Sequence, residues 1–180
     1  MKIKIRYLKR TDYPAWKKAK SLQLPMQNRF DSAKPALSDL TRSKFNAIIR
    51  RQIKNRKEDK SYQFGVFAGE QLVGTVTLGS ILRTYMHTAS IGYHIFNNHW
   101  GKGYGSQALT QLLEFSFVEQ KLHRLVAGIE PGNNRSINLV RKFNFRREGI
   151  SKRAVLFQGK WLDLIQYALT CEEYGVIWQG

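Results

Sequence analysis

The chain has 180 residues, 42% of them hydrophobic and 12% aromatic, a composition that excludes a disordered protein. Its formal net charge is +17, and no apolar run approaches the roughly 18 residues of a membrane span. The opening MKIKIRYLKRTD alternates charged with apolar side chains and lacks the apolar core of a secretory signal. We therefore expect a single cytoplasmic domain, residues 1–180, with no membrane contact. The lone cysteine, Cys171, excludes an internal disulfide.

The positive charge is concentrated in the first third of the chain. Residues 1–60 carry a net +13, whereas residues 61–180 carry a net +4. A field of this sign attracts polyanions, so we expect residues 1–60 to contact a ribosome or RNA. The alternative is an ordinary solvated surface rich in lysine.

Hydrophobic periodicity and turn residues predict eleven elements of secondary structure. In chain order they are a strand over 3–8, a helix that begins at Thr11 to Pro14, a helix over about 38–57, strands over 64–68, 72–80 and 89–96, a helix over 103–120, a strand over 125–130, a helix over 134–144, and a closing hairpin that turns near Gln158-Gly159. Residues 23–37 read as a loop. This order predicts a mixed sheet covered by helices.

The stretch HWGKGYGSQA, residues 99–108, places three glycines around a lysine between a predicted strand and a predicted helix. It is not a Rossmann fingerprint, because Ser106 stands where that motif needs its third glycine. It is not a P-loop, because no glycine lies five residues before Gly101. Backbone N–H groups at the start of a helix favour an anion, so we expect a phosphate site here. A tight turn in which glycine adopts positive φ is the alternative.

A second motif, P-x-N-x-x-S, lies in EPGNNRSINLVRKFNFRREG (130–149) as Pro131, Asn133 and Ser136. Together with the glycine loop, SIGYHI, HRLVA and GKWLD, it resembles the GNAT N-acetyltransferases over about residues 61–171. The loop of that family reads R/Q-x-x-G-x-G/A, and Trp100 replaces its first residue here. The resulting W-G-K-G is similar to the Rim-type branch, which acetylates the N-termini of ribosomal proteins.

The resemblance implies an α/β (α+β) fold with a mixed, mostly antiparallel, twisted sheet of six to seven strands and about four flanking helices. It also implies acetyl-CoA as cosubstrate, with the pyrophosphate over the loop amides and the pantetheine arm along strand 89–96. The implied cofactor residues are His94, Ile95, Phe96, Gly101, Lys102, Gly103, Tyr104, Gly105, Ser106, Asn133, Ser136, Arg141 and Lys142. For Arg141 and Lys142, a solvated helix face is the alternative, and for Asn133 an N-cap.

In the implied mechanism an amine attacks the thioester directly, and Ser136 donates a proton or hydrogen bond to the leaving thiolate. Many GNAT enzymes carry a tyrosine acid four residues later, where this chain has Val140, and the glutamate of a related branch is absent near Val155. His94, Glu130 and Asp163 remain as candidate bases. The other histidines have no cysteine or carboxylate at metal-ligand spacing, so we predict no metal site.

The absence of a strong base bears on the acceptor. An α-amine of pKa about 7.7–8 costs only about 1 kcal/mol to deprotonate at pH 7, whereas a lysine near 10.4 costs roughly 4.6 kcal/mol. We therefore expect transfer to the N-terminal α-amine of a protein, and the resemblance implies a ribosomal one. The alternatives are a small amine such as a polyamine or aminoglycoside, and a non-catalytic module that stacks RNA bases on Tyr7, Tyr13, Trp16 and Phe30.

Overall fold

Seven strands form the sheet, in the order β1-β2-β3-β4-β5-β7-β6. The structure, a computed structural model, describes residues 2–178. The strands are β1 (Lys4–Arg6), β2 (Ser61–Ala68), β3 (Gln71–Leu82), β4 (Thr88–Ile95), β5 (Arg124–Ile129), β6 (Arg146–Phe157) and β7 (Lys160–Thr170). Strands β4 and β5 pair in parallel, whereas β1–β2, β2–β3, β5–β7 and β6–β7 are antiparallel. The expected mixed, mostly antiparallel α+β fold is confirmed.

Five helices accompany the sheet in the described part of the chain: α1 (Tyr13–Ser21), α2 (Arg42–Lys57), α3 (Tyr104–Glu114), α4 (Asn134–Lys142) and α5 (Cys171–Tyr174). Helix α2 begins later than expected because Thr41 caps it, its hydroxyl accepting the N–H of Lys44 at 3.2 Å. The helix expected over 103–120 becomes π-helical over Phe115–Glu119. Helix α5 was not predicted from the sequence. No helix among residues 2–178 combines the length and apolar character needed to cross a bilayer.

The chain divides into two compact units. The first comprises the residues up to Gly79 together with Gly92–Leu113, and the second comprises Ser80–Ile91 with the residues from Glu114 onward. The assignment of residues 1–180 to one domain stays a prediction.

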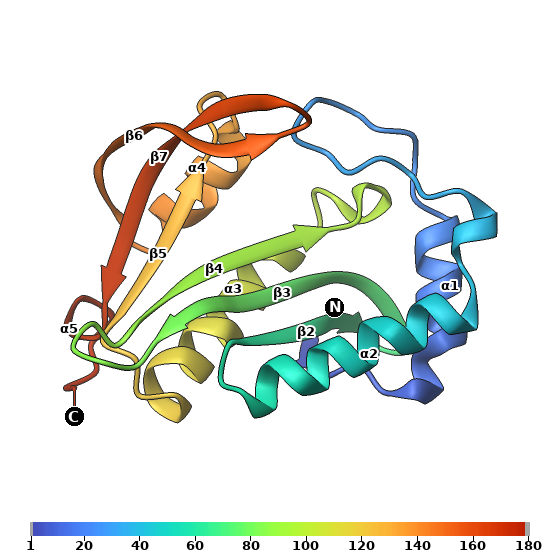
Figure 1. Cartoon of the computed structure of the whole chain (residues 1–180), viewed down its shortest axis with the longest axis horizontal. Helices are drawn as coiled ribbons and strands as arrows, with labels where there is room; N and C mark the ends of the chain where they lie inside the picture. Colours follow the sequence, from blue (N-terminus) through green and yellow to red (C-terminus); the bar gives the residue numbers. More distant parts are fainter. Residues whose placement is uncertain (1, 179–180) are drawn as a thin grey trace. The chain divides into compact units, whose positions relative to one another are not determined.

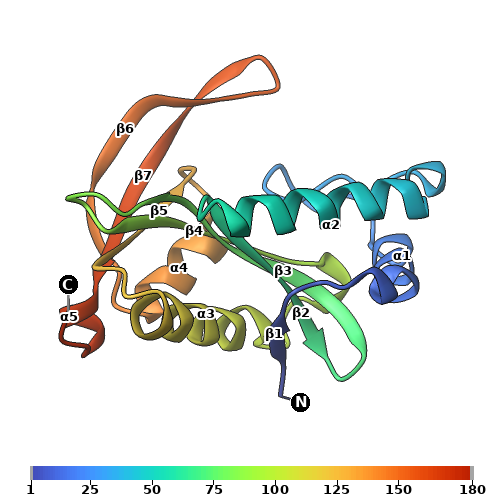
Figure 2. The ribbon, with the colours of Figure 1, turned by 60° about the horizontal axis from the view of Figure 1, so that its bottom comes forward.

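An aromatic core fixes α1 and α2 in the first unit. Trp16 of α1 and Phe45 of α2 lie 5.1 Å apart between ring centroids and are only 7% and 0% exposed. Tyr13 packs on both rings, and Phe67 of β2 belongs to the same buried cluster. Figure 2 shows α2 and α3 on opposite faces of β2 and β3. Trp16 and Tyr13 are therefore core residues, which makes them poor candidates for stacking RNA bases.

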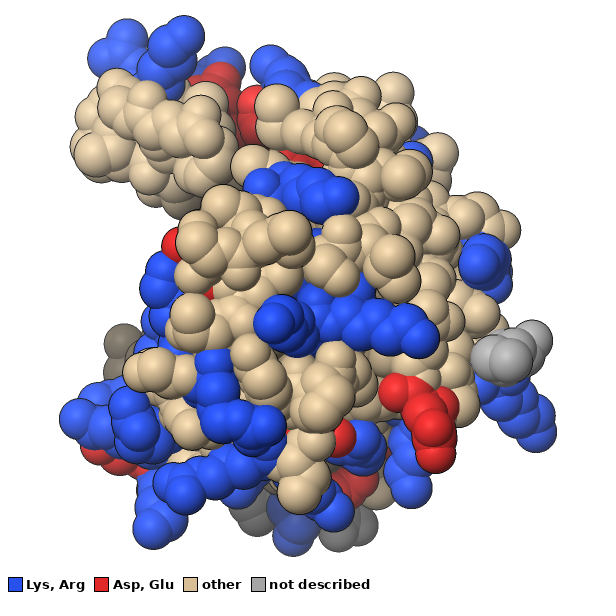
Figure 3. All heavy atoms as spheres, turned by 90° about the vertical axis from the view of Figure 1, so that its right-hand side faces the viewer, with Lys and Arg blue, Asp and Glu red and all other residues tan. Residues whose placement is uncertain are grey.

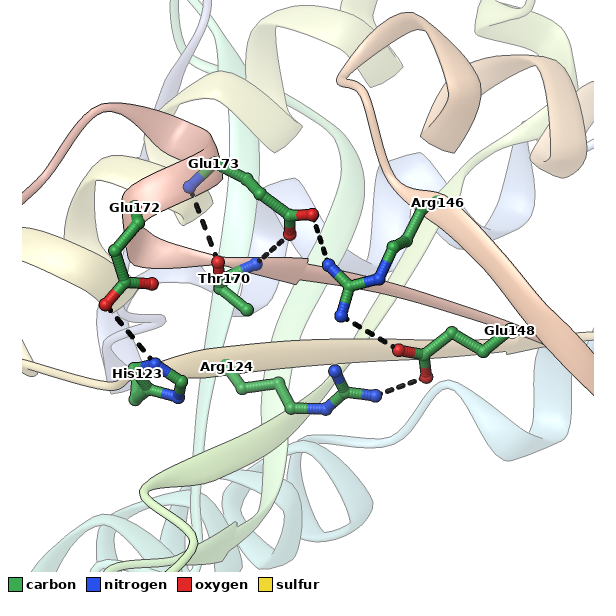
Figure 4. A network of polar contacts seen from close by, with 7 residues as sticks. All are labelled: His123, Arg124, Arg146, Glu148, Thr170, Glu172 and Glu173. Carbon is green, nitrogen blue, oxygen red and sulfur yellow. Dashed lines mark hydrogen bonds and ion pairs between the residues drawn. The ribbon is translucent and has the colours of Figure 1, made fainter.

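The second unit is built on β5, β7 and the long hairpin of β6 and β7, visible in Figure 1. The hairpin turns at Gln158 and Gly159, as expected, and both residues have positive φ. A chain of ion pairs runs across the strands near the start of β6, from Glu173 through Arg146 and Glu148 to Arg124 (Figure 4). Thr170 and Glu173 form a capping box that starts α5.

The aromatic core yields a stability prediction. We expect Phe45→Ala to lower the free energy of unfolding by about 3–5 kcal/mol, because it leaves a cavity between α1 and α2. Ile53→Ala on the same helix, where the side chain is 38% exposed, is expected to cost well under half as much. Urea unfolding measures both, and equal losses would contradict the assignment of Phe45 to the core.

Candidate functional site

The glycine loop joins the short turn after β4 to the start of α3. Gly101 and Gly103 have φ of +78° and +72°, and a Cβ at either position would meet no atom within 4 Å. The first turn of α3 follows directly, and the amides of residues 101–106 have no recorded acceptor within residues 2–178. The loop therefore presents consecutive bare N–H groups at the positive end of a helix, an arrangement that binds anions. Lys102 is exposed beside them and adds positive charge.

Trp100 holds the loop against the end of β4. Its indole N–H donates to the carbonyl of Ile95 at 2.7 Å, a contact that the sequence did not reveal. The amide of Phe96 donates to Val73 at 2.9 Å, and the carbonyl of Phe96 accepts the amide of His99 at 2.8 Å. The Ile95 carbonyl and both backbone groups of Phe96 thus already form hydrogen bonds within the chain. The expected pairing of pantetheine with the backbone of His94 to Phe96 stays a prediction.

His94, on β4, has an unusual environment. Its Nε2 atom is buried and has no hydrogen-bond partner among residues 2–178. Its ring meets that of Phe96 edge-on, with centroids 5.5 Å apart, and the Nζ atom of Lys20 lies 4.4 Å from the Phe96 ring centroid. Burial lowers the pKa of His94, and the charge of Lys20 lowers it further, whereas Asp31 acts in the opposite direction. The imidazole is therefore held neutral at physiological pH, with a nitrogen able to accept a proton.

Residues far apart in the sequence build this environment. Asn97, directly after Phe96, is buried, and its side-chain amide donates to the carbonyl of Leu24 at 2.9 Å and to the carboxylate of Asp31 at 2.9 Å. Its side-chain oxygen accepts the amide of Leu24 at 2.7 Å. Lys20, Asp31 and Asn97 were missed by the sequence analysis, because no local spacing links Asn97 to a residue 66 positions earlier.

The P-x-N-x-x-S motif lies in the second unit, at the start of α4. The side-chain oxygen of Asn133 accepts the amide of Ser136 at 3.3 Å, so Asn133 does act as the N-cap. Ser136 is half-buried in the first turn of α4, and Arg141 and Lys142 are exposed in the last turn. Their roles toward a cofactor stay predictions.

The other candidate bases have less suitable surroundings. The carboxylate of Asp163 accepts from Lys152 Nζ at 2.8 Å and from the amide of Arg153 at 2.9 Å. The Lys152 contact, aided by that amide, lowers the pKa of Asp163, so this carboxylate is a weak base. Glu130 is half-buried and its carbonyl accepts the amide of Asn133, which gives it a part in the turn before α4.

The fold places a carboxylate beside one histidine that the sequence analysis left without a partner. His123 Nε2 lies 3.3 Å from the carboxylate of Glu172 (Figure 4), and the thiol of Cys171 is close to both. Burial, together with Glu172, raises the pKa of Cys171 to about 11, which disfavours the thiolate that a metal ion would need. The absence of a metal site stays a prediction.

Comparison with known proteins identifies the family of this chain. Residues 2–146 match the model of the acetyltransferase (GNAT) domain. The chain belongs to the GNAT acetyltransferase family. The resemblance noted from the sequence is thereby confirmed.

Three relatives illustrate the range of the family. A probable N-acetyltransferase of Bacillus subtilis, YjcK, is 38% identical over 109 residues, 59% of this chain and 60% of that protein. The [ribosomal protein uS5]-alanine N-acetyltransferase of Escherichia coli is 30% identical over 120 residues, 66% of this chain and 62% of that protein. The structure of Mycobacterium smegmatis RimJ in complex with CoA-disulfide shares the fold, with a TM-score of 0.80, 24% identity, and coverage of 95% of this chain and 83% of that one. The chain thus spans about three-fifths of the length of these two curated relatives.

The family's cosubstrate, acetyl-CoA, fits the residues present. The open space at Gly101 and Gly103 leaves room for a pyrophosphate to approach the bare amides of the loop, and Lys102 supplies a countercharge. The acetyl thioester supplies the activated acyl group.

Gly103 provides a test of the anion cradle. Gly103→Ala is expected to weaken acetyl-CoA binding about tenfold or more, because a side chain at positive φ distorts the loop and occupies the approach to its amides. Isothermal titration with acetyl-CoA measures the change.

Gly69→Ala is the matched control. Gly69 has φ of +60° and equally open surroundings, but it lies in the turn between β2 and β3. Both variants are expected to lose about 1–2 kcal/mol of stability from the strained backbone. Equal losses of acetyl-CoA affinity in the two variants would refute a cofactor role for Gly103.

Proposed function

We propose that this protein transfers the acetyl group of acetyl-CoA to the N-terminal α-amine of a protein, with a ribosomal protein as the favoured substrate. The observation that carries the proposal is His94, a half-buried and neutral imidazole on β4 whose Nε2 atom is buried and has no hydrogen-bond partner in the described chain. It lies on the strand that leads into the anion-binding loop.

In the proposed reaction the acceptor amine attacks the thioester carbonyl directly. A C–N bond forms, the C–S bond breaks, and His94 Nε2 takes the proton that the amine loses. The departing thiolate is protonated from solvent, and the expected hydrogen bond from Ser136 to it stays a prediction. No covalent enzyme intermediate is needed.

The pKa of the acceptor amine must be low enough for a weak base such as His94. An imidazole whose pKa lies below its usual 6.5 is too weak a base to deprotonate a lysine near 10.4. An α-amine of pKa about 7.7–8 is already partly deprotonated at pH 7, so a weak base that takes the proton released during attack is sufficient. Lys20, close to the Phe96 ring, also repels a cationic side chain. These features favour an N-terminal amine over a lysine. The name of the Escherichia coli relative, an alanine N-acetyltransferase of a ribosomal protein, supports the same choice.

A polyamine acceptor would need spare carboxylates, and the first 60 residues offer few. Every acid among them is already engaged: Asp12 by Arg6, Asp31 by Asn97, Asp39 by Lys44, Glu58 by Lys60 and Asp59 by the Tyr62 hydroxyl. This engagement disfavours a polycationic substrate.

The pH dependence of kcat/KM tests His94. Two deprotonations, of the acceptor ammonium and of His94, should make log(kcat/KM) fall with a slope of two below the pKa of His94, which lies under 6.5. His94→Gln is expected to lower kcat/KM about 10²-fold and to leave a slope of one, set by the ammonium alone. Steady-state assays from pH 5 to 9 measure both.

Lys20→Met is the companion variant. Removing its charge should raise the pKa of His94, so the second bend of the profile should move to higher pH. Unchanged acetyl-CoA affinity in both variants serves as the control for folding. A slope of two that persists in His94→Gln would exclude His94 as the base.

The acceptor class is tested with peptides. At saturating acetyl-CoA, peptides with a free N-terminal alanine or serine should be acetylated at least tenfold faster than the same peptides with a blocked N-terminus and an internal lysine. Mass spectrometry locates the acetyl group, and spermidine serves as the small-amine comparison. Faster acetylation of spermidine than of any peptide would replace the proposed substrate class, and a chain that binds no acetyl-CoA would overturn the enzymatic function itself.

A further inference from the structure

Helix α2 is unusually rich in cations. Its sequence RSKFNAIIRRQIKNRK, residues 42–57, contains seven lysines and arginines and no acid. The inward side of the helix is occupied by Phe45 and Ile49, which are buried in the core of the first unit. The cations must therefore be accommodated on the remaining surface.

Three of these cations have structural partners. The guanidinium of Arg42 lies 4.5 Å from the ring centroid of Tyr13, and that of Arg56 lies 4.0 Å from the ring centroid of Tyr7. Lys44 pairs with Asp39. Each of these side chains is fixed at the junction of α2 with neighbouring segments, and the fold itself explains them.

The other four cations lie together on the outer side. Arg50, Lys54 and Lys57 are spaced by four and three residues, so they share one exposed face of the helix, and Arg51 is exposed beside them. Arg50, Arg51 and Lys57 form no ion pair with any described residue, and Lys54 reaches Glu58 only at 3.9 Å. Like charges at these spacings destabilise a helix, and the long Lys54–Glu58 contact is the one ion pair that the described chain sets against this repulsion.

We propose that Arg50, Arg51, Lys54 and Lys57, the α2 stripe, form a docking surface for the phosphate backbone of RNA. Figure 3 shows more lysine and arginine than acidic side chains on the face that it draws. Residues 1–60, which include the stripe, carry a net charge of +13, and this field adds to that of the stripe. A polyanion with closely spaced phosphates relieves the repulsion within the stripe and releases its own counterions on binding.

The chemistry of the stripe specifies the mode of binding. The one aromatic residue of α2, Phe45, is fully buried, and Trp16 of α1 packs against it, so α2 offers no platform for stacking bases. Contact is limited to phosphates and is independent of sequence. The outer face also carries the small residues Ser43 and Ala47, and Ile53, which is 38% exposed, is the single large apolar side chain beside the stripe. An anionic membrane, which would need several such side chains for insertion, is therefore disfavoured.

The test measures the salt dependence of RNA binding. Fluorescence anisotropy with a labelled 16-base-pair RNA duplex is recorded between 50 and 200 mM KCl for the wild type and for the triple variant Arg50→Gln, Lys54→Gln, Lys57→Gln. With a slope of about 0.9 per phosphate contact, taken from duplex DNA, three lost contacts reduce the slope of log K against log[salt] by about 2.7. The wild type should then lose about 40-fold more affinity across this range than the variant.

A matched control distinguishes the effect of the α2 stripe on RNA binding from the effect of the protein's net charge. The triple variant Lys2→Gln, Arg147→Gln, Lys160→Gln removes the same charge at exposed positions outside α2 and should keep the slope of the wild type. Equal slopes for both triple variants would mean diffuse attraction and would overturn the proposal. So would binding to vesicles of phosphatidylserine and phosphatidylcholine without binding to the duplex.

Two further readouts keep the test independent of catalysis. The stripe variant should retain the melting temperature of the wild type or exceed it, because the substitutions relieve repulsion. Acetylation of a free peptide should be unchanged, because the stripe is not part of the cofactor loop or the His94 environment. A failure of RNA binding would therefore leave the proposed acetyl transfer untouched.

Discussion

The side chain of Asn97 holds together the region on which the proposed chemistry depends. Its carboxamide exchanges hydrogen bonds with both backbone groups of Leu24 and also donates to the Asp31 carboxylate. Asp31 in turn accepts the amides of Gln27 and Ser32 at 3.0 and 2.8 Å. A buried polar network that is satisfied in this way specifies one backbone arrangement, because breaking any member leaves a buried group unpaired. The loop between α1 and α2 is thereby fixed against the residue that follows β4.

The anchored loop also contributes to the electrostatic environment of His94. Burial favours the neutral imidazole, and Lys20 reinforces that preference, while Asp31 opposes it from within the anchored loop. Had Asp31 lain closer and without its amide partners, its charge would have favoured imidazolium, which cannot accept a proton. The hydrogen bonds that spread the charge of Asp31 over Asn97 and two amides thus serve folding and keep the base usable.

Local patterns were sufficient to predict most of the helices and strands and the glycine loop. Strand alternation, helical periodicity and glycine at positive φ each depend on only a few neighbouring residues. The family resemblance implied a mixed, mostly antiparallel sheet, but the strand order and the parallel pairing of β4 with β5 were not predicted. The environment of His94 could not be predicted, because Lys20, Asp31 and Asn97 converge from separate segments. The contact of the Trp100 indole could not be predicted either. The sequence shows that Trp100 stands where the family motif has Arg or Gln, but only the fold shows that its N–H donates to the Ile95 carbonyl. Helix α5 is four residues long and gives no periodic signal.

The distribution of charge in the first unit shows which residues the fold needs. The acids among residues 1–60 each have a specific partner, as in the bidentate contact of Arg6 with Asp12 at 2.7 and 2.9 Å. Several of its cations, including Arg42 and Arg56, form cation–π contacts with aromatic rings. The remaining cations repel one another along one face of α2, where Lys54 alone has an ion-pair partner among the described residues, Glu58 at 3.9 Å. A sequence selected for stability alone would place glutamate at some of these positions, since pairs at four-residue spacing stabilise helices. The retention of unrelieved like charge is therefore explained by an external anion more simply than by the needs of the fold.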